Sequence, residues 1–228
     1  MLAYIVRRLL WTPVLLALAA FFVFFMGTCA PGDPAELRLG PRATEERIKV
    51  ERTRLGLDRP LLFQYGKYVN GILKGDFGVS YHYQGRPVTE LLLPKLWVSV
   101  QLNIAALIVA VSIGLPLGFY AAKKQGTGRD PAIVISMLIL YAMPIFFTAP
   151  LLILFFAVKL HWVPAAGWDG FFSLQIILPA LSIGIPGAAI FVRHMRASTL
   201  EVIGQEYVRT AHAKGMSNFV VNYRHIAR

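Results

Sequence analysis

Four long apolar runs, separated by polar stretches, dominate the hydropathy pattern of this 228-residue chain. A helix needs about 20 apolar residues to cross the roughly 30 Å hydrocarbon core of a bilayer. The runs that reach this length cover residues 9–30, 96–122, 131–158 and 171–192. We therefore predict an all-α membrane protein with four membrane-spanning helices, which we call spans one to four.

Basic residues gather at three ends of these spans, at residues 7–8, 123–129 and 193–196. Lys and Arg are enriched in the short cytoplasmic loops of membrane proteins. This bias predicts a cytoplasmic N-terminus, and it places residues 31–95, between the first two spans, outside. The short turn around residues 161–170 is expected to be external as well.

The external segment is predicted to be helical rather than a flexible linker. Thr44 and the acidic residues after it favour a helix start, and Gly56 favours its end. Asp58 is expected to cap a second helix, with Pro60 in its first turn. The apolar face predicted for this second helix consists of Leu61, Leu62, Tyr65, Tyr68, Val69 and Ile72. Packing is the expected role of this segment.

Prolines interrupt the predicted spans. Each one removes a backbone hydrogen-bond donor and favours a bend, a defect that lipid tolerates only where neighbouring helices satisfy the freed groups. The prolines of the third and fourth spans are Pro144, Pro150, Pro179 and Pro186. Asp130 is predicted to cap the third span, with Pro131 in its first turn. These features predict a bundle of kinked helices.

Small residues recur at intervals that allow helices to approach closely. Gly114 and Gly118 form a small-xxx-small pair in the second span. Gly184, Gly187 and Ala188 form a second small-residue stripe in the fourth. The pattern fits a mobile contact around a translocation path, and it also fits ordinary helix packing.

The last stretch of the chain is basic and amphipathic, and it is predicted to form two short helices. Residues 198–201 match a capping box, which predicts a helix that starts there and ends at Lys214, with Gly215 left-handed. Its predicted face is Leu200, Ile203, Tyr207 and Ala211. Ser217 is expected to cap the second helix, whose predicted face is Phe219, Val220, Tyr223 and Ala227. The pair suits either a surface helix among lipid headgroups or an element that docks another protein.

Composition agrees with the membrane assignment and narrows the function. Charged residues make up 15% of the chain, against about 25% in soluble domains. The net charge of +11 is spread between apolar runs rather than gathered on one basic surface, which argues against nucleic-acid binding.

Motifs for catalysis or ion coupling are absent from the sequence. The span interiors carry no ionisable residue, whereas proton-coupled carriers place such groups there. No phosphate-binding loop of the Gly-x-x-x-x-Gly-Lys-Ser/Thr type occurs, so the chain is not expected to be an ATPase. The five histidines are isolated and Cys29 is the single cysteine, so neither a metal site nor a cofactor is expected.

Several motifs resemble one family, the inner-membrane permease subunits of bacterial ABC importers of the dipeptide, oligopeptide and nickel type. The resemblance is closest in LPALSIGIPGAAIFVRHMRASTLEVIGQEYVRTAHAKG, residues 178–215. The segments YIVRRLLWTPVLL, APGDPAELRLGPRAT, LGLDRPLLFQYGKYV and GDFGVSY are similar to the N-terminal part of the same binding-protein-dependent transport permease family.

The resemblance implies a coupling role for the basic terminal stretch. In this family a cytoplasmic segment, the EAA loop, fits a cleft on the ATP-binding subunit. Counting back from Gly215 places its Glu-Ala-Ala positions on Arg209, Thr210 and Ala211, and the peptide branch is similar in having Arg-Thr-Ala there. Glu206, just upstream, is a further candidate contact.

The resemblance also implies an organisation and a set of partners. An N-terminal membrane helix (1–30) and the external segment (31–95) would precede a core permease domain (96–228). Family members have six spans, so the chain is expected to be a partial one that stops inside the coupling loop. The implied partners are a second homologous permease, two ATP-binding cassette subunits, an extracytoplasmic solute-binding protein and the lipid bilayer.

The expected function is that of a multi-pass permease subunit in a bacterial inner membrane, forming part of a path for peptides or similar small solutes. Dipeptides, longer peptides, glutathione-like compounds and nickel complexes are all substrates within the family. Two alternatives remain at this point: a membrane carrier or channel that works without an ATPase, and a non-transporting membrane assembly protein.

Overall fold

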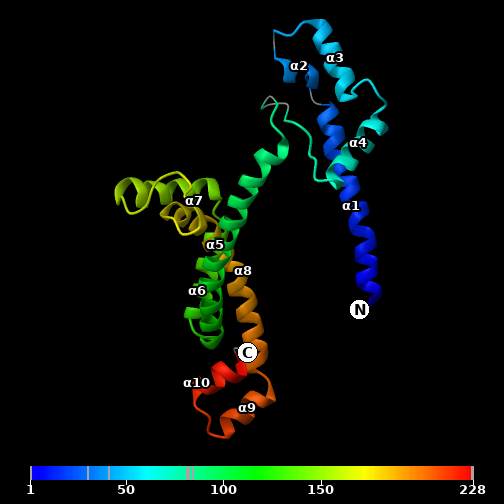
Figure 1. Ribbon diagram of the computed structural model, residues 1–228. Coiled ribbons are helices and arrows are strands. Elements are labelled where there is room, and N and C mark those ends of the chain that lie inside the picture. Colours follow the sequence, from blue (N-terminus) through cyan, green and yellow to red (C-terminus); the bar gives the residue numbers. More distant parts are fainter. Residues whose placement is uncertain (1, 30, 41, 81–82, 84, 227–228) are drawn as a thin grey trace. The chain divides into compact units, whose positions relative to one another are not determined.

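The computed structural model describes residues 2–29, 31–40, 42–80, 83 and 85–226 (Figure 1). Within these ranges the chain is helical and forms no strand, although Val79 and Pro87 pair in one isolated antiparallel bridge. The predicted all-α fold class is confirmed. The chain divides into two compact units, residues 1–96 and 97–228. Ala30, the predicted end of the first span, lies outside the described residues.

The helices of the first unit are α1 (Leu2–Cys29), α2 (Pro34–Leu39), α3 (Glu45–Leu55) and α4 (Leu61–Leu73). Thr44 precedes α3 and Gly56 ends it at φ +78°, as predicted. Asp58 was expected to cap α4, but this prediction is wrong. The helix begins at Leu61, because Pro60 before it holds an extended ψ of 144°.

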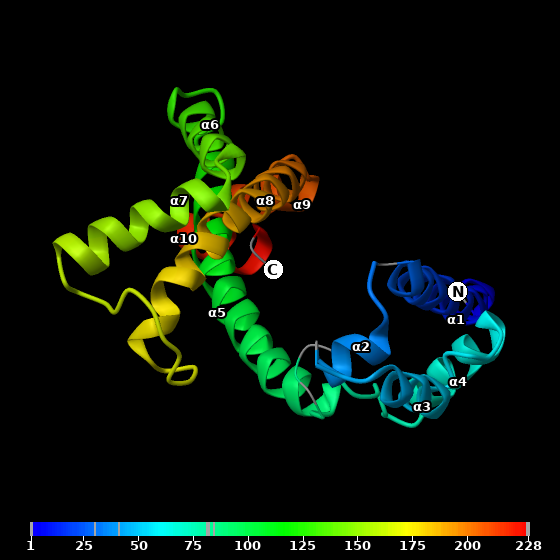
Figure 2. The ribbon, with the colours of Figure 1, turned by 90° about the horizontal axis from the view of Figure 1, so that it is seen from above.

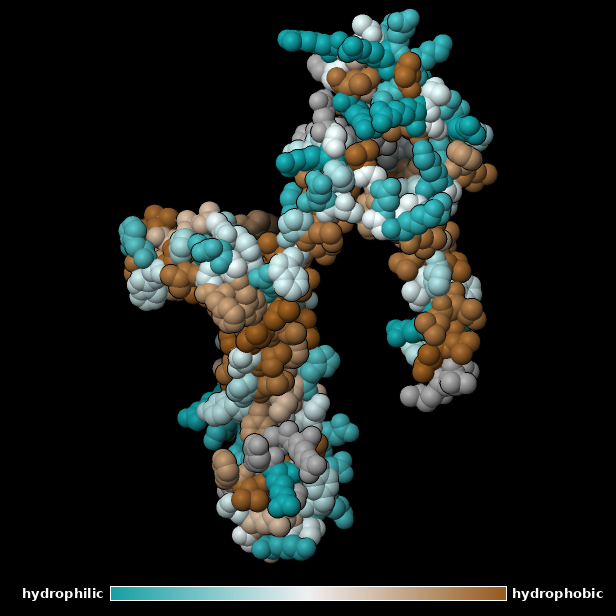
Figure 3. Space-filling view, viewed as in Figure 1, coloured by the Kyte–Doolittle hydropathy of each residue, from teal (hydrophilic) through white to brown (hydrophobic). Residues whose placement is uncertain are grey.

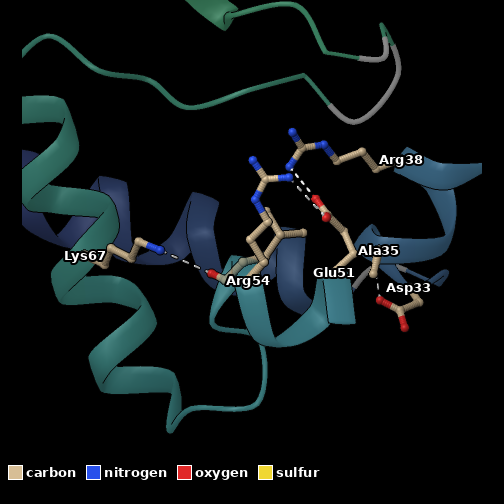
Figure 4. A network of polar contacts seen from close by, with 7 residues as sticks. Asp33, Ala35, Arg38, Glu51, Arg54 and Lys67 are labelled. Atoms are coloured by element: carbon tan, nitrogen blue, oxygen red, sulfur yellow. Dashed lines mark hydrogen bonds and ion pairs between the residues drawn. The ribbon is translucent and has the colours of Figure 1, made fainter. Parts of the chain in front are cut away.

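A polar layer joins α2 to α3. Glu51 is buried and forms ion pairs with Arg38 at 2.8 Å and with Arg54 at 3.6 Å (Figure 4). Asp33 caps α2 through the amide of Ala35 at 2.9 Å and pairs with Arg52 at 2.6 Å. Helix α2 was not expected from the sequence, because its six residues are too few for a periodic signal.

The second unit holds most of α5 (Val88–Lys123), followed by α6 (Arg129–Ala142), α7 (Ile145–Leu152) and a π-helix, η1 (Ile153–Lys159). A 3-10 turn, η2 (Leu174–Ile176), leads into α8 (Ile177–Ile203). The chain then forms α9 (Glu206–Ala213), α10 (Asn218–Val220) and a second π-helix, η3 (Val221–Ile226). Within this unit α8 packs against both α6 and α7, which Figure 2 shows from above.

Three described helices are long and apolar enough to cross a membrane: Tyr4–Cys29, Val88–Lys123 and Leu174–Ile203. In the space-filling view the visible surface is mostly hydrophobic along α1 and along the middle of α5 (Figure 3). Spans one, two and four of the sequence analysis fall within these helices apart from a few terminal residues. The three helices agree with a multi-pass membrane protein.

Span three was predicted over residues 131–158 with a bend at Pro144, and the structure interrupts it there, as a full break rather than a kink. The structure breaks it into Arg129–Ala142 and Ile145–Lys159, bent by 97° at the break. Met143 is extended, with φ −72° and ψ 123°, and Pro144 follows it. Proline disfavours helical conformation in the residue before it, so the break falls at Met143.

The other prolines fall at different kinds of position. Pro150 lies inside α7, and Pro186 lies inside α8. Pro179 is the third residue of α8, where a proline removes no helical hydrogen bond. Pro179 therefore marks the start of the helix rather than a bend within it.

Two predicted helix starts are corrected by the structure. Asp130 does not cap α6, because the helix already includes Arg129 and its N-cap is Gly128. The capping box at residues 198–201 is not used, because α8 continues through it to Ile203. The chain leaves the helix only at Gly204 and Gln205, and Gln205 has an extended ψ of 147°.

Candidate functional site

The terminal segment, residues 204–226, forms a compact element that we call the handle. Its first helix, α9, ends in a Schellman motif. Gly215 has φ +76°, its amide donates to the His212 carbonyl at 2.9 Å, and the Met216 amide donates to the Ala211 carbonyl at 3.3 Å. The predicted left-handed Gly215 is confirmed. This conformation turns the chain sharply between α9 and α10.

A small apolar core fixes the handle to the ends of two long helices. Its buried members are Val208, Ala211, Val221 and Ile226. Phe119 of α5 and both Val202 and Ile203 of α8 pack against this cluster. Any displacement of the handle therefore acts directly on α5 and α8.

The predicted apolar faces of the handle are only partly right. Ala211 is buried and Ile203 half-buried, but Tyr207 is 50% exposed and Val208 takes its place. On the second helix Phe219 and Val220 are exposed, whereas Val221 and Ile226 are buried.

The apolar face predicted for the second helix is wrong because most of that helix, η3, is a π-helix. A π-helix has i to i+5 hydrogen bonds, and this spacing moves Val221 and Ile226 onto one side. Ala227 and the side chain of Tyr223, also predicted on the apolar face, lie outside what the structure describes.

The residues predicted for coupling lie mostly on the surface of the handle. Glu206, Arg209 and Thr210 are exposed and share one side of α9, since they are spaced i, i+3 and i+4. The Thr210 hydroxyl donates to the Glu206 carbonyl at 3.0 Å. Gly215 is exposed, whereas Ala211 lies in the core beneath. The geometry thus offers one exposed polar side and one anchored apolar side.

The predicted small residues form the contact between α5 and α8. A β-carbon at Gly114 would lie 2.5 Å from Phe191 Cβ, and one at Gly118 would lie 2.6 Å from the Val192 carbonyl oxygen. On the opposite helix, a β-carbon at Gly184 would lie 2.7 Å from the Ala106 carbonyl oxygen. The close approach of α5 and α8 is therefore possible only because these three positions carry no side chain.

A polar cluster ties α5, α6 and α8 together near the handle. Arg196 binds Asp130 with two hydrogen bonds of 2.6 Å, from Nε to Oδ1 and from Nη2 to Oδ2. Arg129 donates to the Tyr120 hydroxyl at 3.2 Å. We call the Asp130–Arg196 pair the clamp, since it connects the start of α6 to α8, the helix that leads into the handle.

Sequence reasoning missed the clamp. Asp130 stands before a proline at a helix start, which is a strong capping signal, and it was interpreted in that way. Arg196 was counted only as part of a basic cluster. One signal was available. Asp130 stands at the start of a membrane helix, where it is buried, and a buried carboxylate needs a cationic partner.

Two apolar cavities flank the break between α6 and α7. One of about 280 Å³ is lined by residues that include Leu140, Met143, Thr148, Phe156, Leu181 and Pro186. Another of about 230 Å³ is lined by residues that include Ile145, Ala149, Gln175, Pro179, Ser182 and Ile183. The broken span is thus loosely packed on both sides of α7.

Two family descriptions match the chain. Residues 114–228 match the family "binding-protein-dependent transport system inner membrane component". Residues 1–101 match the corresponding N-terminal family of such membrane components. Together the two matches cover nearly the whole chain.

Curated relatives agree with these matches. A probable peptide ABC transporter permease, y4tP of Sinorhizobium fredii, is 36% identical over 97% of this chain and 72% of its own length. The glutathione transport system permease GsiC of Escherichia coli K12 is 35% identical over 99% of this chain and 72% of its own length. The oligopeptide permease OppB of Haemophilus influenzae is 35% identical over 100% of this chain and 74% of its own length.

Proposed function

Because the chain belongs to the family of binding-protein-dependent transport system inner membrane components, and is therefore a permease subunit of an ABC importer, we propose that its handle is the coupling element. ATP hydrolysis in such importers resides on separate subunits, so this chain is not an enzyme. An ATPase-independent carrier and a non-transporting assembly protein, the two alternatives, are not favoured by the family assignment.

The anchoring of the handle is the observation that carries the proposal. Its buried core packs against Phe119 of α5 and against Val202 and Ile203 of α8. Glu206, Arg209 and Thr210 stay exposed on the other side. A docked subunit that bound the exposed side would move two membrane helices at once. A coupling element must make different contacts in the two states of its partner to shift the permease, and polar exposed side chains can do so.

We assign a transmission role to the clamp. Arg196 lies seven residues before the end of α8, and its guanidinium holds Asp130 at the start of α6. Motion of the handle can therefore pass through α8 into α6 and reach the break at Met143. The two cavities around α7 leave room for that segment to shift.

We propose peptides as the substrate class, supported by the printed names of the peptide, oligopeptide and glutathione permeases. The apolar lining of both cavities in the second unit fits a path that makes few specific polar contacts with its cargo. Uptake of a labelled tripeptide by cells that carry the complete importer, compared with cells lacking this subunit, tests this assignment. Equal uptake in both would contradict it.

The assembly and orientation complete the proposal. The chain is a multi-pass inner-membrane protein, and we propose that its N-terminus and its handle face the cytoplasm, with residues 31–95 outside. We propose as partners a second homologous permease, two ATP-binding cassette subunits and an extracytoplasmic solute-binding protein. A membrane anchor (1–30), an external segment (31–95) and a core permease (96–228) are the proposed parts.

Replacement of Gly215 with valine tests the coupling role. A residue with a β-carbon pays about 1–2 kcal/mol in the left-handed conformation, so the turn after α9 should open. We expect ATP-dependent uptake to fall about 5- to 30-fold, the factor that this free energy corresponds to. Membrane insertion should not change, because no other atom lies within 4 Å of the new β-carbon position.

Gly170 provides the matched control for this substitution. It also has a positive φ, +88°, and open space around its β-carbon position, but it lies in the loop before α8. Gly170→Val therefore adds comparable backbone strain away from the handle. Uptake that stays at the wild-type level in Gly215→Val, or drops equally in both variants, would count against coupling through the handle.

A further inference from the structure

We propose that α4, although it belongs to the segment assigned to the outer side, enters the bilayer to the depth of the acyl chains next to the outer headgroup layer, with a stripe of its side chains in contact with lipid. The stripe consists of Leu62, Val69 and Leu73, spaced i, i+7 and i+11 along one side of the helix. The inference rests on the first unit alone and on α1 as a membrane span.

Contacts with α1 set the position of α4. The Tyr65 hydroxyl donates to the Ala17 carbonyl at 2.7 Å. The Tyr65 ring packs edge-on against Phe21 with ring centres 5.3 Å apart, and the Tyr68 ring lies 5.6 Å from Phe24. These residues of α1 belong to its long apolar run, so α4 is attached to the flank of a membrane span rather than to its tip.

The depth of these contacts follows from helix geometry. Phe24 and Phe21 stand five and eight residues before Cys29, the last residue of α1. At 1.5 Å per residue these distances are about 8 and 12 Å. The charged residues of α2 and α3 begin directly after α1, so its end marks the edge of the hydrocarbon layer. Amphipathic helices that lie in the membrane interface are buried by about 5–10 Å, which matches the Phe24 contact. Ala17, which accepts the Tyr65 hydroxyl, lies about 18 Å from the end of α1, so the deepest contact of α4 is nearer the bilayer centre.

The two apolar stripes of α4 have different surroundings. Tyr65, Tyr68 and Ile72 form the stripe toward α1 and are half-buried. Leu62 is 78% exposed and Leu73 is 80% exposed, so the first unit leaves both ends of the second stripe uncovered, whereas Val69 between them is half-buried. A membrane helix that exposes leucine at acyl-chain depth gains the free energy of removing that surface from water.

Two polar side chains of α4, Gln64 and Lys67, reach toward the end of α3 and the turn after it. The Gln64 amide donates to the Leu57 carbonyl at 3.2 Å and to the Arg59 carbonyl at 2.7 Å. The Lys67 ammonium donates to the Leu55 carbonyl at 3.4 Å (Figure 4). The polar edge of α4 is thereby directed to the charged layer of α2 and α3, which fits the orientation of a helix at a membrane interface.

Lipid is favoured over another protein as the occupant because α1 also exposes apolar side chains at the depth of its contacts with α4. Phe22 is 61% exposed, Val23 64% and Met26 71%, at the same depth as the α4 contacts. Arg59 stacks over the Phe63 ring at 4.9 Å, a pairing that keeps its apolar stem in contact with an aromatic ring while its charge reaches the headgroups. Acyl chains can cover irregular apolar surfaces of this kind without specific complementarity.

Spin-label accessibility in the assembled importer, reconstituted in lipid nanodiscs, tests the inference. Cys29 is first replaced by serine, and single cysteines at Leu62 or Leu73 carry the nitroxide. Collision with oxygen reports lipid contact and collision with a water-soluble nickel chelate reports water contact. Phe22→Cys on α1 serves as the lipid reference, and Lys49→Cys, exposed on α3, as the water reference.

We expect the oxygen-to-nickel accessibility ratio at both α4 positions to match the Phe22 reference and to exceed the Lys49 reference several-fold. Labels at Leu62 and Leu73 that collide with nickel as readily as the Lys49 label would overturn the inference, since α4 would then lie in water. Labels shielded from both reagents would also overturn it, because a second protein chain would then cover the stripe. Two exposed positions are used so that the result does not depend on one variant assembling.

Discussion

Replacing Gly118 with alanine is expected to separate α5 from α8 and to abolish transport. The added β-carbon would lie 2.6 Å from the Val192 carbonyl oxygen and 2.8 Å from Met195 Cβ. The first of these is a backbone atom in the middle of α8, so it cannot move aside as a flexible side chain would. Overpacking of this kind costs about 1–3 kcal/mol, and the handle core next to it would lose its register with Phe119. The thermal stability of the purified subunit in detergent and ATP-dependent uptake measure the effect.

Gly187 supplies the control for this experiment, since it belongs to the small-residue stripe of α8 that faces α5. A β-carbon there would lie 3.5 Å from Ala110 Cβ, an ordinary van der Waals contact. Alanine is also favoured over glycine inside a helix by about 1 kcal/mol, so Gly187→Ala should be neutral or slightly stabilising. Equal melting temperatures for the Gly118→Ala and wild-type subunits would show that α5 and α8 are not packed as closely as described.

Arg196→Gln is expected to destabilise the protein and to uncouple ATP hydrolysis from uptake. The substitution leaves the buried Asp130 carboxylate without its cationic partner. Removal of one member of a buried pair costs about 3–5 kcal/mol. The Arg196 side chain is 30% exposed, so we expect a loss near the lower end of that range. Stability is measured by thermal unfolding in detergent, and coupling by the ratio of peptide taken up to ATP hydrolysed.

The double variant Asp130→Asn with Arg196→Gln separates the charge from the connection. It removes the unpaired carboxylate, so its stability should recover relative to Arg196→Gln alone. Asp169→Asn, which removes an exposed carboxylate in the loop before α8, should change neither quantity. A double variant no more stable than Arg196→Gln would mean that the pair does not carry the interaction described for the clamp.

Much of the architecture could be predicted from local signals. The lengths of the apolar runs were enough to place three spans, because a membrane helix is fixed by bilayer thickness and by its own backbone hydrogen bonds. Gly56 and Gly215 were placed correctly, since a left-handed turn at a helix end strongly favours glycine. Gly114 and Gly118 were recognised as contact residues, but a stripe of small residues does not say which helix it meets.

The errors arise where tertiary contacts override a local pattern. The signal for a helix start at residues 198–201 is strong, yet α8 stays helical through it, because Val192 packs against α5 and Thr199 is buried within the fold. The prediction for Asp130 fails for the same reason, because its carboxylate pairs with Arg196 of another helix instead of capping its own helix. The faces of the handle depend on a π-helix, and its spacing is not visible in a search for the 3.6-residue period.

The candidate coupling residues came from a counted spacing, and only their exposure could be added from the structure. Glu206, Arg209 and Thr210 lie on the accessible side of α9, whereas Ala211 is part of the core that holds the helix down. Val208, which no sequence signal singled out, occupies the centre of that core. Side-chain burial in a short helix is decided by the helices beneath it rather than by its own eight residues.

The interruption at Met143 makes the second half of span three a hinged segment. Met143 retains its hydrogen bond to the Ile139 carbonyl at 3.2 Å, and Pro144 has no amide hydrogen to lose. Rotation about the two torsions of Met143, within the extended region, would swing α7 without breaking a hydrogen bond of either helix. The energetic barrier to reorienting α7 is therefore set by side-chain packing around the two cavities and not by backbone hydrogen bonds.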